Sequence, residues 1–235
     1  VEELETLASP PTVFFGGIGE PLSHSHLPQM IERVKALGCR VEMITNGTLL
    51  TESKAREIIS AGLELLWGSI DGARPESYAD VRLGAELPRV IKNLKRFRRL
   101  RRPAHHPVPE MGIAFVAMKR NVAELSELPR LATHVGAWYI QVSNLVPHTP
   151  EMEREILYKR SLTACAFRAS PWVADMSLPK FDLDAHTSEP LRRVFGSTAS
   201  LSLLDVSLSG RNDYCRFAQE GYAAVRWDGE VSPCL

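Results

Sequence analysis

The chain has 235 residues, 44% hydrophobic and 24% charged, and its 28 basic and 28 acidic side chains give a formal net charge of zero. This composition is typical of a globular protein with one large domain or slightly more. The balanced charge argues against nucleic acid or a membrane surface as a partner, and no apolar run approaches the roughly 18 residues of a membrane span. The first residues do not resemble a signal peptide, so four cysteines predict a reducing, cytoplasmic setting.

Short apolar runs alternate with longer amphipathic segments through the first part of the chain. The runs predict strands and the amphipathic segments predict helices, which is the pattern of parallel βαβ units. Right-handed crossovers would curl such units into an α/β fold, a full or partial (β/α) barrel. The expected strands are 12–15, 41–44, 65–70, 112–118 and 138–142, and the expected helices are 27–37, 51–59, 86–100 and 122–135.

The alternation ends near residue 147, where we expect a boundary. Beyond it the sequence predicts a helix over 151–167, a segment over 169–190 that is mostly loop, and a short helix over 191–195. Asp228-Gly229 separates two β-prone runs, which is a strong signal for a hairpin. The expected domains are therefore a core over 1–147, a linker or helical region over 148–209, and a small C-terminal extension over 210–235.

Polar residues or glycine follow directly after the apolar residues in four of the five predicted strand ends. The five segments are 16–20, 45–47, 69–72, 119–121 and 143–145. In barrels of this kind the chemistry sits at the carboxyl ends of the strands. Structural turns also favour glycine, asparagine and aspartate, so any one segment alone could be a turn. The whole series is harder to explain by turns alone.

Three of these segments carry the resemblance to a known family. Gly16-Gly17-Ile18-Gly19-Glu20-Pro21 resembles a "GGEP" turn with one residue inserted, and Thr45-Asn46-Gly47 resembles a "TNG" turn. Ser69 and Asp71 resemble an "S-x-D" motif. From its second strand onward the chain therefore resembles the radical S-adenosylmethionine (SAM) superfamily, with a SPASM or twitch-type C-terminal extension. This resemblance implies strands 2–6 of a partial (β/α)6 TIM-like barrel.

The resemblance also implies where the cofactor SAM would bind. Gly16 and Gly17 would lie along its methionine part, and Glu20 would help to receive its ammonium group. Ser69 would face its carboxylate or ribose, and Arg82 would pair with its carboxylate. The implied cofactor-binding residues are Gly16, Gly17, Gly19, Glu20, Thr45, Asn46, Ser69, Asp71, Arg82, Asn121, Leu145 and Val146, the last two of which would pack against adenine.

The cysteines set the chain apart from the usual family pattern. The superfamily binds a [4Fe–4S] cluster through C-x3-C-x2-C, which does not occur in this sequence. A truncated chain and a protein that has lost the cluster are both open, and we expect truncation. Cys215 and Cys234 resemble ligands of an auxiliary Fe–S cluster, although a structural zinc site is the alternative. Cys39 and Cys165 are expected to be small buried hydrophobic residues.

The resemblance implies a radical SAM oxidoreductase or maturase. Such an enzyme cleaves SAM reductively to a 5′-deoxyadenosyl radical, which abstracts hydrogen from a peptide or cofactor-precursor substrate. Its partner would be an electron donor such as ferredoxin or flavodoxin. The segment 147–152 is similar to a subgroup that modifies the cofactor of a tungsten enzyme. The alternatives are a SAM- or nucleotide-binding barrel without a cluster, and an unrelated (β/α) enzyme that binds phosphate at its glycine turn.

Two surface features have simpler interpretations. His24 and His26 are expected to be loop histidines rather than metal ligands, and His148 a solvent-facing one. The basic run over 92–102 leaves apolar residues on one helical face, which indicates a solvated outer face rather than an RNA-binding surface.

If the first family strand is absent, the strand over 12–15 has an unpaired edge, and we expect the protein to associate.

Overall fold

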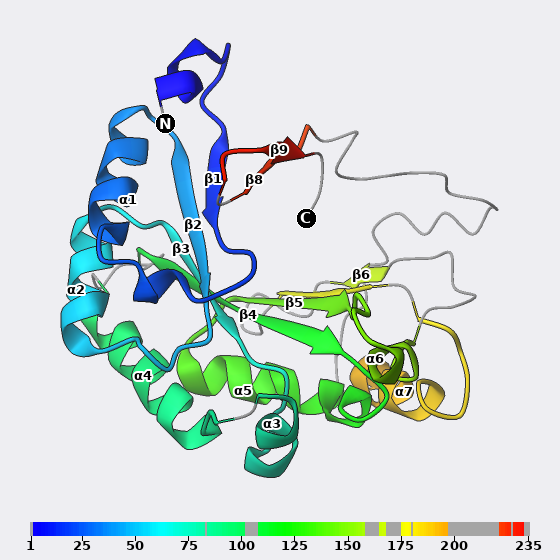
Figure 1. Cartoon of the computed structure of the whole chain (residues 1–235). Helices are drawn as coiled ribbons and strands as arrows, with labels where there is room; N and C mark the ends of the chain where they lie inside the picture. The colour runs from blue at the N-terminus through cyan, green and yellow to red at the C-terminus, as the bar shows by residue number, and fades with distance from the viewer. Residues whose placement is uncertain are drawn as a thin grey trace.

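A computed structural model describes residues 2–82, 84–101, 108–157, 165–167, 175–179, 181–196, 221–226 and 228–232. Its centre is a seven-stranded sheet with the order β1-β2-β3-β4-β5-β7-β6 (Figure 1). All neighbouring pairs are parallel except β6 with β7, which is antiparallel. The strands are β1 Thr12–Phe15, β2 Arg40–Thr45, β3 Leu65–Ser69, β4 Glu110–Ala117, β5 Tyr139–Asn144, β6 Cys165–Phe167 and β7 Asp175–Leu178.

The larger helices lie in an arc along one side of this sheet (Figure 1). A separate two-stranded antiparallel hairpin, β8 Ala224–Val225 and β9 Val231–Ser232, lies near the C-terminus. The α-helices are α1 Leu27–Ala36, α2 Glu52–Ser60, α3 Pro75–Val81, α4 Leu87–Leu100, α5 Leu128–Val135, α6 Pro150–Glu153 and α7 Ser188–Gly196. Three 3-10 helices complete the described elements: η1 Glu2–Thr6, η2 Pro21–Ser23 and η3 Val122–Glu127.

The core lies between the sheet and these helices. Alternate residues of β2, such as Val41 and Met43, are fully buried, whereas their neighbours are only partly covered. In α4, Val90, Leu94 and Phe97 recur at helical spacing and are fully buried, so this helix packs one apolar face on the sheet. The basic residues of α4 are thereby turned outward, as the sequence predicted.

The fold class and the first five strands are confirmed, and so is the C-terminal hairpin. The helix expected over 122–135 is divided, because Pro129 lies in the first turn of α5 and has no N–H to continue a helix from η3. Helix α3 was not predicted. Its seven residues are too few for a clear amphipathic period.

The expectations for 151–167 and 169–190 are wrong in part. Helix α6 covers only Pro150–Glu153, and β6 occupies Cys165–Phe167 within the expected helix. Strand β7 lies within the expected loop and pairs in parallel with β5, from Tyr139↔Asp175 to Gln141↔Ser177. Four residues give little local signal, so pairing with β5 defines this strand. The domain division at residue 147 stays a prediction.

Candidate functional site

Five parallel strands bring the ends singled out in the sequence to one edge of the sheet. Strands β1 to β5 are consecutive neighbours in the sheet, so their carboxyl ends lie side by side in chain order. Residues far apart in sequence, from the turn after β1 to the end of β5, therefore meet along this carboxyl edge. This edge is the candidate site.

The turn after β1 is a glycine-rich loop in which larger residues are disfavoured, by crowding at Gly16 and by backbone conformation at Gly17 and Gly19. A Cβ atom on Gly16 would lie 2.3 Å from the Phe14 ring and 2.8 Å from the Ile44 side chain. Gly17 and Gly19 have φ angles of 103° and 123°, which side chains rarely adopt, and open space surrounds both. Backbone is thus exposed at this turn, where a ligand can approach it closely.

Glu20 ties this turn to the end of β2. Its Oε1 accepts hydrogen bonds from Thr45 Oγ1 at 2.7 Å and Leu22 N at 3.1 Å, and its Oε2 accepts one from Asn46 N at 2.7 Å. A carboxylate has about four acceptor positions, so one remains for a further donor such as an ammonium group. Thr45 is buried, and its Oγ1 also accepts from Gly47 N at 3.0 Å.

Ser69, Asp71 and Arg82 form a second group, at the end of β3. The Arg82 guanidinium donates through Nε to Asp71 Oδ2 at 2.8 Å, and its Nη2 also donates to Ser69 Oγ. The Asp71 side chain is only 4% exposed, and its Oδ1 accepts from Val116 N at 2.8 Å. One end of the guanidinium is therefore occupied by Asp71 and Ser69, whereas Nη1 has no hydrogen-bond partner among the described residues and can take another acceptor.

Asn121 is fully buried beneath this group. Its Nδ2 donates to Asp71 O at 3.0 Å and to Val116 O at 2.9 Å, and its Oδ1 accepts from Met118 N at 2.7 Å. These bonds hold the turn after β4 against the end of β3. In this structure, Asn121 orders the backbone under Asp71. Its role in cofactor binding stays a prediction.

Two further residues support the edge and carried no motif in the sequence. Glu124 is buried and accepts hydrogen bonds from Ala73 N at 2.6 Å and Ser77 Oγ at 2.9 Å, which fixes the start of α3 after Asp71. Tyr78 is fully buried beside Arg82 and Asp71, and burial raises the pKa of its hydroxyl. The only signal for Glu124 in the sequence was its position, three residues after the predicted site residue Asn121.

The end of β5 holds a buried acceptor without a partner. Asn144 Oδ1 is buried and accepts no hydrogen bond among the described residues. Leu145 is 9% exposed and Val146 is 65% exposed, so the chain turns from the core to the surface directly after Asn144. The segment 143–145 was among the strand ends singled out in the sequence, but Asn144 was not among the predicted cofactor-binding residues. A buried acceptor left unpaired costs about 1 to 3 kcal/mol, which favours a ligand or water donor here.

The residues of the carboxyl edge fit SAM. They offer exposed glycine backbone, one acceptor position on Glu20 for an ammonium, and Arg82 Nη1 for a carboxylate. Asn144 offers an acceptor for an N–H or O–H donor of the adenosine. Hydrogen bonds between charged partners of this kind are about twice as strong as neutral ones.

The residues present do not fit a [4Fe–4S] cluster. The sequence lacks the three-cysteine spacing, and no group of three or more metal-ligating side chains occurs in the described part of the chain. Cys39 is a buried free thiol, as expected for a small hydrophobic residue. Cys215 and Cys234 lie outside the described residues, as does the side chain of Cys165.

No helix in the described ranges is long and apolar enough to cross a membrane.

Glu64 and Asp71 lie at opposite ends of β3, where Glu64 accepts a hydrogen bond from Val41 N at 2.8 Å and Asp71 accepts one from Val116 N. They therefore do not form a pair of carboxylates for acid–base chemistry.

The chain is similar to curated proteins over most of its length. It is 31% identical over 228 residues to the tungsten-containing aldehyde ferredoxin oxidoreductase cofactor-modifying protein of Pyrococcus furiosus, which covers 94% of this chain and 56% of that protein. It is 29% identical over 148 residues to the AdoMet-dependent heme synthase of Methanosarcina barkeri, covering 63% of this chain and 40% of that one. The chain thus spans about half the length of these relatives.

A solved structure and a family model agree with this similarity. A domain of the pyruvate-formate lyase-activating enzyme from Bacteroides vulgatus has the same fold, with a TM-score of 0.51 and 13% identity over 79% of this chain and 94% of that domain. The model of the Radical SAM superfamily matches residues 1–109, which include every predicted site residue from Gly16 to Arg82. The matched region of this chain therefore belongs to the Radical SAM superfamily.

Proposed function

We propose that this chain is the SAM-binding part of a radical SAM oxidoreductase or maturase. The observation that carries the proposal is the carboxyl edge, where Glu20, Arg82 and Asn144 each keep a hydrogen-bonding position for a ligand. In this superfamily, bound SAM supplies the 5′-deoxyadenosyl group that abstracts hydrogen from the substrate. The protein's share is to bind and orient SAM and to exclude water.

Each of these residues has a part in holding SAM. Glu20 receives the ammonium, and its bonds to Thr45 and Asn46 N keep the carboxylate in place before SAM arrives. Arg82 holds the SAM carboxylate through Nη1 while Asp71 fixes the other end of the guanidinium. Asn144 accepts a hydrogen bond from the adenosine, next to Leu145 and Val146. Gly19 keeps the turn open.

The substrate we propose is a cofactor precursor, with a peptide as the alternative. The relative of Pyrococcus furiosus is named as a cofactor-modifying protein and aligns over 94% of this chain, which supports the first class. The whole protein would need an electron donor such as ferredoxin or flavodoxin. Cys215 and Cys234 are proposed to contribute to an auxiliary Fe–S cluster of a SPASM or twitch region, formed over 210–235.

Binding of SAM tests the proposal directly. We expect saturable binding by isothermal titration calorimetry, and about tenfold weaker binding by Asn144→Leu because one hydrogen bond to SAM is lost. Asn144 Oδ1 has no partner within the described chain, so the variant should keep its melting temperature. Gln141→Leu, on the same strand with its side chain exposed, is the matched control and should bind SAM as the parent does. Absence of SAM binding by the folded parent protein would overturn the proposal.

A second candidate function is a SAM-binding barrel without a cluster. The carboxyl edge alone would support it, because the positions on Glu20 and Arg82 that are proposed for SAM involve no cluster ligand. Anaerobic purification of the product of the complete gene, with iron analysis and electron paramagnetic resonance after reduction, separates the two. A reduced cluster signal that SAM perturbs supports the radical enzyme, and SAM binding without iron supports the binding module.

A further inference from the structure

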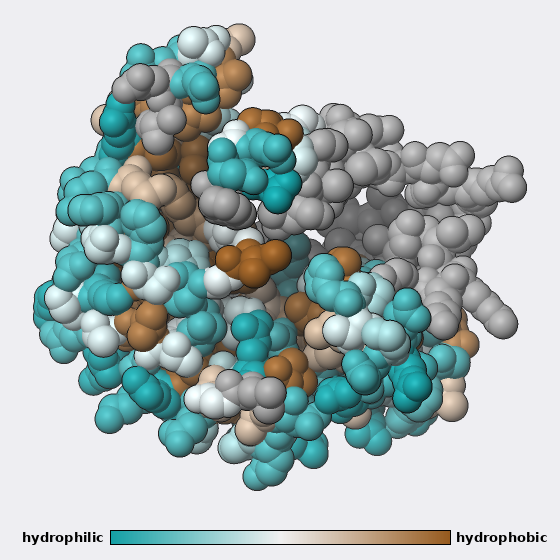
Figure 2. Space-filling view, in the orientation of Figure 1, coloured by the Kyte–Doolittle hydropathy of each residue, from teal (hydrophilic) through white to brown (hydrophobic). Residues whose placement is uncertain are grey.

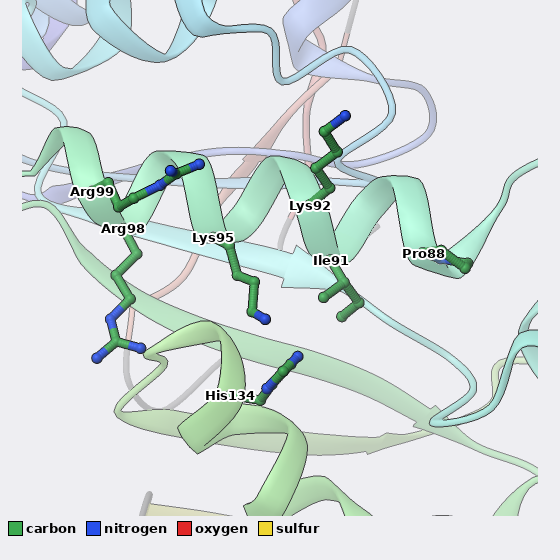
Figure 3. Close-up of a pocket in the computed structure, with 7 residues that line it drawn as sticks. All are labelled: Pro88, Ile91, Lys92, Lys95, Arg98, Arg99 and His134. Carbon is green, nitrogen blue, oxygen red and sulfur yellow. The ribbon is translucent and has the colours of Figure 1, made fainter.

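A groove of about 680 Å³ lies between α4 and α5, on the outer side of the fold. Figure 3 shows Ile91, Lys95 and Arg98 extending from α4 toward His134 of α5. Lys92 and Arg99 also belong to the lining of the groove, although Lys92 points away from His134 and Arg99 extends along α4, and Pro88 is near the first turn. The groove therefore has cationic side chains over most of its length and apolar residues at one end.

The positive charge of this groove is not neutralised within the described part of the chain. None of its lining residues is acidic, and the described ion pairs include none to Lys92, Lys95 or Arg98. Arg99 lies within the influence of Glu52, but that carboxylate already pairs with Arg56 at 2.7 Å. The protein has no net charge, so this positive field is local to α4 and α5.

The spacing of the cations indicates the kind of ligand. Seven positions separate Lys92 from Arg99, which is about 10 Å of helix. Cations spread over this length match a series of carboxylates better than a single phosphate. Pro88 and Ile91 add an apolar contact at one end. We propose that this groove binds an acidic polypeptide segment of a partner protein, with an apolar residue of that segment on Ile91.

This groove is separate from the carboxyl edge. The opposite face of α4 contacts the turn after β2, where buried Asn93 donates to Gly47 O at 2.8 Å. A Cβ atom on Gly47 would lie 2.9 Å from the Val90 side chain, so helix and turn are in close contact. The acidic segment would thus dock on the face of α4 that points away from the turn after β2, and it would not cover the carboxyl edge. Its binding therefore does not depend on SAM binding.

Fluorescence anisotropy with a labelled peptide of alternating glutamate and leucine residues tests the proposal. We expect saturable binding that weakens as salt is added, since exposed charge pairs are screened. The double variant Lys95→Glu/Arg98→Glu should bind at least about tenfold more weakly, because two attractions become repulsions. Arg89→Glu is the matched control, an exposed cation of α4 outside the groove, and should bind within about twofold of the parent.

Circular dichroism and SAM titration on the same samples show that the variants are folded. Equal losses in the double variant and in Arg89→Glu would overturn the proposal, since the peptide would then follow the general field of α4. Binding of inorganic tripolyphosphate in place of the peptide would also overturn it, in favour of a phosphate ligand. So would a peptide that does not bind the parent protein even at low salt.

Discussion

At the residue scale, the Asp71–Arg82 ion pair connects the stability of the carboxyl edge to its proposed chemistry. We expect Asp71→Asn to lower the free energy of unfolding by about 2 to 3 kcal/mol, below the roughly 3 to 5 kcal/mol for breaking a buried pair, because Arg82 reaches solvent. SAM affinity should fall too, since the guanidinium loses its fixed position. Urea unfolding and calorimetry measure the two effects.

Asp80→Asn is the control for that experiment. Asp80 pairs with Arg120 at 2.9 Å, but its side chain is 62% exposed, so the loss should stay below about 1 kcal/mol. Equal losses from the two substitutions would show that the Asp71 pair has no special part in the fold.

The residues of this site differ in how far the sequence could predict them. The resemblance to the family implies Ser69, Asp71 and Arg82 as site residues, and the structure does bring them together. Their mutual contact could not be predicted, because it depends on where α3 places Arg82. Asn144 could not be predicted as an unpaired acceptor, because burial of one amide oxygen depends on packing between elements distant in the chain.

At the scale of elements, Gly72 lies in close contact with the backbone of α3. A Cβ atom on Gly72 would lie 2.4 Å from Tyr78 N and 2.6 Å from Tyr78 Cα, which are backbone atoms that can move only with the helix. We expect Gly72→Ala to lower the free energy of unfolding by about 1 to 3 kcal/mol. The measurement is urea unfolding, with Arg82 placement monitored through SAM affinity.

Gly84→Ala provides the comparison for Gly72. Gly84 has a φ of 77° but nothing within 4 Å of an added Cβ, so its substitution costs backbone strain alone, about 1 kcal/mol. A smaller effect for Gly72→Ala than for Gly84→Ala would contradict the packing argument.

Glu64 gives the starts of β2 and β3 a dependence on pH. Burial would raise the pKa of Glu64, but Lys35 Nζ at 2.9 Å and Val41 N at 2.8 Å together lower it below its ordinary value. The stability that this carboxylate contributes is therefore present above its unfolded-state pKa and is lost as pH falls through the folded one. We expect Glu64→Gln to be less stable than the parent near pH 7 and about equal to it near pH 3.

Urea unfolding at a series of pH values checks this prediction. Lys35→Met is the partner control, because removing the ammonium should remove most of the difference in pH dependence between parent and Glu64→Gln. A stability gap that stays constant from neutral to acid pH would contradict the assignment.

The elements themselves were predictable to the extent that they have a local pattern. Strands β1 to β5 contain apolar runs, all but β4 end at or next to glycine or small polar residues, and α4 has a sustained helical period. Strand β7 has only four residues between polar and proline-containing segments, so its pairing with β5 is a tertiary effect. The break at Pro129 was visible in the sequence, and the continuous period of apolar residues around it outweighed that signal.

At the scale of the whole molecule, the sheet ends at one side in β1, which pairs only with β2 in the described sheet. Exposed apolar side chains accompany this edge: Leu7 and Phe14 are each 50% exposed, and Ile18 is fully exposed. Figure 2 shows hydrophobic residues gathered at the upper left, toward β1, whereas the lower rim is mainly hydrophilic. An open, apolar edge strand is a template for pairing with a second chain.

We therefore expect this protein to associate as its concentration rises, and Phe14→Lys to reduce that association. A lysine on an edge strand opposes pairing by charge and by its need for water. Light scattering during size-exclusion chromatography measures the effect, with Leu183→Lys as the control, since Leu183 is 79% exposed outside the strands. A monomer at every concentration would contradict the prediction. So would an equal reduction by both variants, because association would then reflect general hydrophobicity instead of the β1 edge.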